Sequence, residues 1–278
     1  MGRLTVCPFR AELNPVRWPV RSSSREWRIL GPMKLLSWNI RQGGGKLADR
    51  IVAAISSHDP DVVALIEYRS APGKELCRML AEGGWKYIES TTQRGRDNGL
   101  CVVSRTPLRR KIDPSVPPEF AVRWLDADVP SYGFGIGVLH IPGSSRKVNG
   151  AAKSRFWDAV LSAAQSRRDT PFVFIGDLNT GAHRIDEAKE TFHCAEHFGR
   201  MTNALGWIDL WRAFNWNTTE YTWYSRRKGG VRGNGFRLDH AFASPALRPR
   251  VVDCRYSHFE REAGTSDHSV LAVEIADA

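Results

Sequence analysis

Short apolar segments recur along the chain, and most of them end on a side chain that can do chemistry. The polar residues at these ends, or just before the final apolar segment, are Asn39, Glu67, His140, Asp177, Asn179, Asp239, Asp267 and His268. One aspartate after a strand usually caps a helix or forms a turn. Several such endings indicate that the strands deliver these groups to one edge of a sheet, where they would form a single cleft.

The segments between these strands have the spacing of helices. Apolar residues at 47, 51, 54 and 55 share one face, and Asp59 and Pro60 end the pattern. We expect further helices over residues 73–81, 151–167 and 185–205. The alternation of strands and helices predicts an α/β fold in which sheets pack together under a cover of helices.

The second half of the chain adds three strand patterns. Residues 221–225 and 236–244 look like paired strands, and residues 268–275 alternate apolar and polar side chains. Between the first two, residues 226–235 are basic and rich in glycine, which predicts a flexible turn rather than the interior of an element.

Composition narrows the class of protein. The chain has 40 Lys and Arg against 30 Asp and Glu, a net charge of +10 that favours an anionic partner such as nucleic acid. Its five cysteines include no CxxC pair, so neither a disulfide framework nor a thiolate zinc site is predicted, and we expect a reducing cytoplasm. An apolar run of about 18 residues, the length needed to span a membrane, is absent.

The first 32 residues differ from the remainder, with dispersed arginines, four prolines and no apolar core of a secretion signal. We expect residues 1–32 to be an N-terminal extension, disordered or the result of a misassigned start codon. Residues 33–278 contain no linker-like segment and are predicted to form one domain, which we expect to be monomeric.

Carboxylates dominate the predicted cleft, so a cation is expected among them. Hard oxygen ligands suit Mg²⁺ or Mn²⁺, and Mg²⁺ commonly binds substrate phosphate as well. For phosphodiester hydrolysis Asp177 would accept the proton of the attacking water, and Asn179 would fix that water or a phosphate oxygen. His268 would donate to the phosphate, with Asp239 behind it raising its pKa.

These residues and their order resemble the endonuclease/exonuclease/phosphatase superfamily, which has the DNase I-like fold. The motifs are "LLSWNIR", "VVALIEYR", "GLCVVSR", "FVFIGDLNTGAH", "GWIDLWR", "YTWYSRRKGGVRGNGFRLDHAFAS" and "GTSDHSVLAVEI". The resemblance is to the exodeoxyribonuclease III and apurinic/apyrimidinic endonuclease branch. It implies a four-layer α/β/β/α sandwich of two mixed β-sheets and a Mg²⁺-dependent nuclease acting on DNA, with Asn39, Glu67 and Asp267 near the metal.

The same branch implies a substrate pocket. Trp223 and Phe236 match positions that line the pocket for a flipped-out abasic sugar, although either can instead be a core aromatic residue. The basic residues that would contact DNA phosphates are Arg226, Arg227, Lys228 and Arg232.

Two positions depart from that branch. Arg41 stands where an acid near the metal is common, so it would weaken metal binding or contact phosphate. His140 stands where tyrosine is usual, which is more like DNase I and the sphingomyelinases, and it is a candidate general acid for the leaving group.

Other substrates and one other chemistry stay open. The same fold can act on RNA, phosphoinositides or sphingomyelin-type lipids. In addition, His193, Glu196 and His197 formally match the HxxEH pattern of inverted zinc peptidases.

Overall fold

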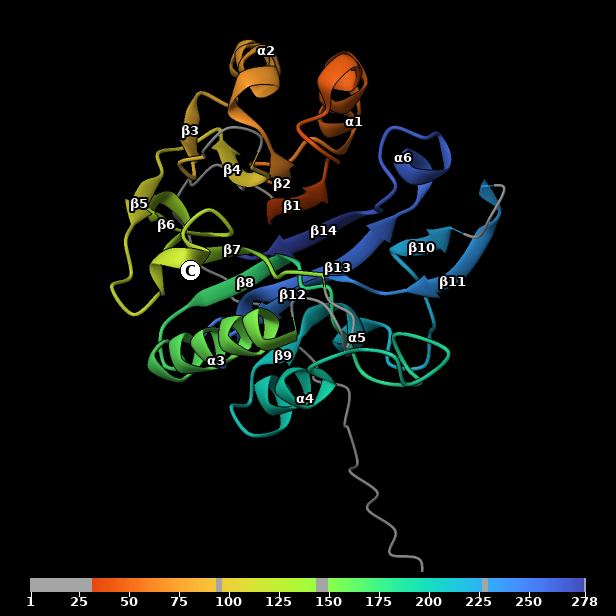
Figure 1. Cartoon of the computed structure of the whole chain (residues 1–278). Coiled ribbons are helices and arrows are strands. Elements are labelled where there is room, and N and C mark those ends of the chain that lie inside the picture. The colour runs from red at the N-terminus through yellow and green to blue at the C-terminus, as the bar shows by residue number, and fades with distance from the viewer. Residues whose placement is uncertain (1–31, 94–96, 144–149, 227–229, 278) are drawn as a thin grey trace, which may run out of the picture. The chain divides into compact units, whose positions relative to one another are not determined.

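The computed structural model describes residues 32–93, 97–143, 150–226 and 230–277, all within one compact unit, Gly31–Ala278 (Figure 1). The strands are β1 Met33–Asn39, β2 Val62–Tyr68, β3 Tyr87–Ser90, β4 Gly99–Ser104, β5 Arg109–Lys111, β6 Trp124–Val129, β7 Phe134–His140, β8 Phe172–Asp177, β9 Ile208–Asp209, β10 Trp223–Arg226, β11 Arg232–Phe236, β12 Asp239–Ala243, β13 Val251–Ser257 and β14 Val270–Ile275. The α-helices are α1 Ala48–His58, α2 Ser70–Glu82, α3 Gly150–Ser166, α4 Ala195–Asn203, α5 Leu210–Phe214 and α6 Phe259–Glu262. Short 3₁₀ turns cover Gly45–Leu47, Pro118–Phe120, Pro130–Tyr132 and Arg248–Arg250.

Two six-stranded sheets form the centre of the molecule. The first has the order β13-β14-β1-β2-β4-β3, and the second has the order β5-β6-β7-β8-β12-β9. Each sheet is mixed, because β1 and β2 are parallel, β7 and β8 are parallel, and the other pairs are antiparallel. Strands β10 and β11 pair with each other in a separate two-stranded sheet.

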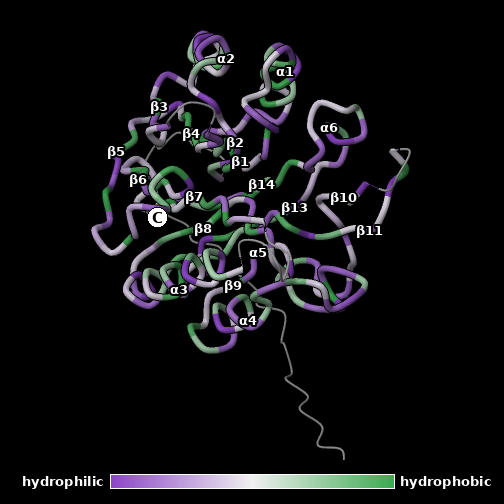
Figure 2. Tube along the Cα trace, viewed as in Figure 1, coloured by the Kyte–Doolittle hydropathy of each residue, from purple (hydrophilic) through white to green (hydrophobic). Residues whose placement is uncertain are grey.

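The largest hydrophobic core lies between the two sheets. Leu35 and Ile66 from the first sheet share one buried cluster with Val138 and Ile175 from the second. Successive side chains of a strand face opposite sides, so each buried strand contributes alternate residues to this core. Hydrophobic residues accordingly run through the central strands in Figure 2.

Helices cover the outer face of each sheet. Ile51 of α1 and Leu76 of α2 pack with the outward residues of the first sheet, and Trp157 of α3 and Phe198 of α4 pack with those of the second. The expected four-layer α/β/β/α sandwich is therefore confirmed (Figure 1). None of the helices in the described part of the chain has the length and apolar content needed to cross a membrane.

The predicted helix over 185–205 is too long. Helix α4 begins at Ala195, and the preceding residues form a loop around a buried carboxylate, Glu187. The backbone N–H groups of Thr191 and Phe192 donate to Glu187 Oε1 at 2.7 and 2.9 Å. These side-chain bonds replace the helical ones, which periodicity alone does not reveal.

The predicted pairing of 221–225 with 236–244 is also wrong in part. Strand β10 pairs with β11, which includes glycine-rich residues predicted to be a turn, while β12 pairs with β8 and β9. A Cβ at Gly235 would lie 2.2 Å from the Tyr221 ring, so glycine at this position allows that ring to pack against β11.

Candidate active site

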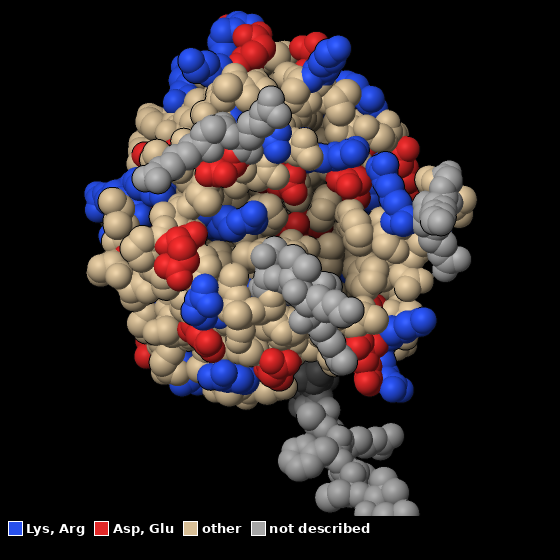
Figure 3. Space-filling view, viewed as in Figure 1, with Lys and Arg blue, Asp and Glu red and all other residues tan. Residues whose placement is uncertain are grey.

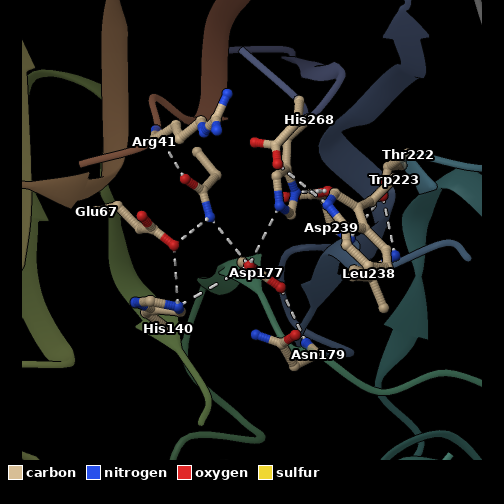
Figure 4. Close-up of polar contacts among 12 residues, drawn as sticks. Arg41, Glu67, His140, Asp177, Asn179, Thr222, Trp223, Leu238, Asp239 and His268 are labelled. Carbon is tan, nitrogen blue, oxygen red and sulfur yellow. Dashed lines mark hydrogen bonds and ion pairs between the residues drawn. The ribbon is translucent and has the colours of Figure 1, made fainter. Parts of the chain in front are cut away.

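Strand register brings together residues that are far apart in sequence. In the second sheet Asp177 at the end of β8 pairs with His140 of β7 on one side and with Asp239 of β12 on the other. In the first sheet β1 ends at Asn39, beside the end of β2. The ends of both sheets supply most of the side chains drawn in Figure 4, while Trp223 comes from β10 and Thr222 from the loop before it.

The Asp177 carboxylate is the centre of this group and is buried. Asn39 Nδ2 donates to Asp177 Oδ2 at 3.1 Å, and the backbone N–H of Asn179 donates to Oδ1 at 3.0 Å. His140 Nε2 and His268 Nε2 each lie 3.9 Å from Oδ2. Burial, reinforced by Asp239, raises the pKa of Asp177 to about 7, against the opposing effect of His268 and the two amide donors.

The glycine before this aspartate is required by the backbone. Gly176 has φ +143°, and a Cβ there would lie 2.1 Å from the carbonyl oxygen of Leu139 on the neighbouring strand. A larger residue would separate β7 from β8 at the place where His140 and Asp177 face each other.

His268 and Asp239 form a buried pair next to Asp177. His268 Nδ1 lies 2.9 Å from Asp239 Oδ2. Burial alone would lower the pKa of His268, but Asp239, with help from Asp177, raises it to about 10, so the ring is a cation at neutral pH. The Thr222 hydroxyl oxygen accepts the backbone N–H groups of Leu238 and Asp239 at 2.9 and 3.2 Å and so fixes the start of β12.

The Glu67 carboxylate is held by three N–H donors. Gln42 N and Asn98 Nδ2 donate to Oε2 at 3.1 and 3.0 Å, and Asn39 Nδ2 lies 3.4 Å from Oε1. Glu67 has φ +60°, an unfavourable backbone conformation for a residue with a side chain. Strain of this kind is typical of functional positions and costs about 1–3 kcal/mol.

His140 is buried and faces a guanidinium. Arg123 Nη1 lies 3.1 Å from His140 Nδ1, and His140 Nε2 lies 4.0 Å from Glu67 Oε1. Burial, with Arg123 and His268 adding to it, lowers the pKa of His140 well below its usual value. The imidazole is therefore neutral at neutral pH, with Nδ1 accepting from Arg123 and Nε2 carrying the proton.

The donor set fits a hard divalent cation. Ligand atoms of Asp177, Asp239 and His268 lie within 4.8 Å of one another, but the protonated His268 ring cannot bind a metal, so the available ligands are oxygens. The Glu67 carboxylate lies close by and shares the Asn39 amide with Asp177. Asp239 Oδ1 is buried and has no hydrogen-bond partner within the described ranges. Figure 3 shows acidic atoms inside a central hollow, with Lys and Arg side chains around it.

The structure places the other predicted site residues at different distances from this centre. Asp267 Oδ2 accepts from Trp223 Nε1 at 3.4 Å and is outside the 4.8 Å group. Asn179 Nδ2 donates to the carbonyl oxygen of Ile141 at 3.0 Å, so its amide N–H is turned away from Asp177. The side chain of Arg41 is exposed, and its backbone N–H donates to Asn39 Oδ1 at 3.0 Å.

The predicted substrate residues lie along the β10–β11 hairpin. The Trp223 ring is half-buried, with its centroid 6.4 Å from the His268 ring and 6.0 Å from the Phe236 ring. Arg226 and Arg232 are exposed and pair across the two strands. Arg227 and Lys228 lie outside the described residues.

The zinc peptidase pattern is not formed. It requires His193 and His197 on one face of a helix, but α4 begins at Ala195, so His193 precedes the helix. The His193 ring instead lies beside the Cys194 thiol, with 3.2 Å between Nδ1 and Sγ.

Sequence reasoning missed four residues that support the site. Asn98 and Arg123 contact Glu67 and His140, Thr222 holds Asp239 in place, and Lys153 donates its buried ammonium to the Asn179 carbonyl oxygen. Burial lowers the pKa of Lys153 to about 8. The turn-like sequence "DNG", which runs into the start of β4, is the one local signal that singles out Asn98. Lys153 looks like any surface lysine of an amphipathic helix.

Two solved structures share this architecture. An AP endonuclease from Archaeoglobus fulgidus superimposes with a TM-score of 0.76 at 22% identity, covering 87% of this chain and 99% of that one. A 3′ phosphatase, NExo, from Neisseria, bound to a product DNA hairpin, gives 0.75 at 22% identity, with coverage of 87% and 99%. At this identity the likeness shows the fold.

Sequence comparison leads to the same group of proteins. The chain is 24% identical over 261 residues to a DNA-(apurinic or apyrimidinic site) endonuclease of Dictyostelium discoideum, covering 87% of this chain and 70% of that protein. It is 24% identical over 279 residues to the DNA repair nuclease APEX1 of Danio rerio, covering 93% and 86%. Residues 36–268 match the model of the Endonuclease/Exonuclease/phosphatase family, and the chain therefore belongs to that family.

Proposed function

We propose that the chain is a divalent-metal-dependent nuclease that hydrolyses phosphodiester bonds in DNA, at abasic sites or at 3′ ends. The observation that supports this most is the buried Asp177 carboxylate, which lies between an amide donor, Asn39, and two imidazoles. Such a carboxylate has the position and the raised pKa of a general base.

In the proposed reaction Asp177 accepts the proton of the attacking water. Asn39 Nδ2 and the backbone N–H of Asn179 hold the carboxylate in place. The His268 cation, kept charged by Asp239, donates to a non-bridging phosphate oxygen and stabilises the charge that develops there.

For His140 we propose a hydrogen-bonding role in place of the general acid considered above. As a neutral imidazole beside Arg123 it offers the Nε2 proton as a hydrogen bond to the phosphate. Asn39 and Glu67, with Asp267, would hold Mg²⁺ or Mn²⁺, which when bound supplies positive charge against the phosphate and the leaving oxygen.

Substrate choice is proposed to depend on the β10–β11 hairpin. Trp223 lies next to His268 and would stack on an extruded sugar or base, with Phe236 behind it. Arg41, Arg226 and Arg232 are exposed cations that would contact the DNA backbone, together with Arg227 and Lys228. The net charge of +10 and the DNA-repair names of the relatives support DNA as the substrate.

A direct test compares cleavage of a plain duplex with that of two modified duplexes, one with an abasic site and one with a recessed 3′ end, and of a single-stranded RNA. Each substrate is assayed with Mg²⁺, with Mn²⁺ and with EDTA. We expect metal-dependent cleavage of DNA that is fastest on one of the two modified duplexes. Cleavage of the RNA but of none of the DNA duplexes, or cleavage that persists in EDTA, would reject the proposal.

A further inference from the structure

A second group of metal-ligating side chains lies at the start of α4. Sγ of Cys194, a carboxylate oxygen of Glu196 and a ring nitrogen of His197 lie within 4.8 Å of one another. Cys194 is 3% exposed, whereas the Glu196 side chain is 72% exposed, so the group extends from the core to the surface. The reaction proposed above uses none of the three.

The two nitrogens of the His197 ring have different surroundings. Nδ1 is buried and has no hydrogen-bond partner among the residues that the structure describes, although Glu196 Oε1 lies 3.0 Å away in a direction that makes no hydrogen bond. Nε2 lies 3.5 Å from a carboxylate oxygen of Asp158, on α3. A histidine that binds a metal through one nitrogen commonly has a carboxylate at the other, which fixes the ring.

The backbone at Cys194 is also unusual. Its φ is +71°, a left-handed conformation, and its side chain makes no capping hydrogen bond to α4. This conformation costs about 1–3 kcal/mol for a residue other than glycine and is typical of functional positions. It occurs here at the thiol that is next to the His193 ring.

From these contacts we propose that Cys194, Glu196 and His197, with His193 beside the thiol, form a second metal site for a cation of the zinc class, such as Zn²⁺ or Co²⁺. One thiolate, one carboxylate and one or two imidazoles match the ligands that zinc takes in proteins. Mg²⁺ is disfavoured, because it prefers oxygen ligands and an octahedral site.

The site is linked to the turn that follows β8. Thr180 Oγ1 donates to the carbonyl oxygen of His193 at 3.4 Å, and the neighbouring Asn179 carbonyl accepts from buried Lys153. A cation bound at Cys194 would therefore fix the segment behind the Asp177–Thr180 turn. Because the ligands differ from those of the active site, the two sites can be tested separately.

Titration of the full-length protein with Co²⁺ tests the proposal. Thiolate ligation gives a charge-transfer absorption band that oxygen and imidazole ligands do not give. We expect the wild type to bind one equivalent with this band, and the Cys194→Ser variant to lose it. Cys77→Ser is the matched control and should retain the band, since Cys77 lies on α2. Absence of the band in the wild type, or its persistence in Cys194→Ser, would overturn the proposal.

A surface variant guards against misfolding of Cys194→Ser. Glu196→Gln changes an exposed side chain, and we expect it to fold normally and to bind Zn²⁺ at least about tenfold more weakly, as measured by calorimetry in excess Mg²⁺. Arg200→Gln, later on the same helix, should leave the affinity unchanged. Equal zinc affinity in the wild type and in Glu196→Gln would rule out this ligand set.

Discussion

His268 and Asp239 form a buried imidazole–carboxylate pair with 2.9 Å between Nδ1 and Oδ2. Asp177 stands on the other side of the same ring, 3.9 Å from Nε2. One histidine thus faces two carboxylates, one of which keeps it charged while the other is proposed to take a proton from water.

The pH dependence of hydrolysis should show both groups. Asp177 must be ionised to act as a base. Because its pKa is about 7, activity should rise as the pH increases towards neutral, and a bound cation would shift this rise to lower pH. His268 must be protonated, and its pKa is about 10, so activity should fall again at high pH. The measurement is kcat/KM against pH, with a bell-shaped profile expected.

The Asp239→Asn variant tests the origin of the alkaline limb. Without the carboxylate at Nδ1 the pKa of His268 falls, so the alkaline limb should move to lower pH. The surface change Asp253→Asn serves as control. An unmoved limb in Asp239→Asn would show that this pair does not set the protonation of the ring.

Removal of the proposed base should lower activity without lowering stability. Asp177→Asn is expected to lower kcat by about 10²–10⁴-fold, the usual range for general acid–base catalysis. Because the buried carboxylate is costly to ionise, the melting temperature should stay equal or rise. Full turnover in this variant would remove Asp177 from the reaction.

Trp223 is predicted to recognise damage rather than DNA in general. Trp223→Ala should reduce cleavage of an abasic duplex more than cleavage of a plain duplex, since only the former offers an extruded sugar to the ring. Trp216→Ala is a matched control, because Trp216 is 78% exposed on a loop. Equal losses on the two substrates would leave Trp223 with a packing role.

Breaking a buried ion-pair cluster around Arg237 should be strongly destabilising. Arg237 Nε lies 2.7 Å from Asp186 Oδ1, and Arg237 Nη2 lies 2.5 Å from Asp209 Oδ2. Arg237→Met leaves two buried carboxylates without this partner and should cost about 3–5 kcal/mol of unfolding free energy at pH 7. Arg255→Met removes two ion pairs at the surface, with Asp253 and Glu274, and should cost about 1 kcal/mol or less.

The same cluster predicts how the difference in unfolding free energy between wild type and Arg237→Met changes with pH. Burial alone would raise the pKa of Asp186 and Asp209, but Arg237 lowers both below the usual value. Their contribution is present above the ordinary aspartate pKa of about 3.9 and is lost as the pH falls through the depressed values. In Arg237→Met burial acts without the guanidinium and raises the pKa of both carboxyls, so they take up protons at pH 4 and lose the cost of buried unpaired charge. Urea unfolding at pH 7 and pH 4 should therefore show a smaller gap between wild type and Arg237→Met at pH 4.

The domain assignment leads to a truncation experiment. Every site residue identified above comes from the chain after Met33, so we propose that residues 33–278 form the catalytic domain. A variant starting at Met33 should keep the melting temperature and kcat/KM of the full chain. Loss of either would give residues 1–32 a part in folding or catalysis.

The sequence predicted the strands and the groups at their ends because both follow from short-range patterns. Asn39, Glu67, His140 and Asp177 each follow an apolar run, and the sheet edge brings them together. The strand patterns do not mark Asn98, Arg123, Thr222 or Lys153, because these residues come from loops or from a helix. Their importance depends on tertiary contacts that no periodicity encodes.

The errors in secondary structure have similar causes. The loop before α4 is organised by buried acids, Asp186 and Glu187, whose partners are distant or are backbone groups. The glycines of β11 look like breakers locally, yet they permit a close contact with Tyr221. In both places side-chain contacts, some of them local and some distant in sequence, override the local backbone preference.

The hairpin of β10 and β11 is hydrogen-bonded as a sheet of its own, apart from both six-stranded sheets. Its sequence can therefore vary with little penalty to the central scaffold. Substitutions in this hairpin can therefore change which nucleic acid is preferred, while the residues for cleavage at the ends of the two sheets stay the same.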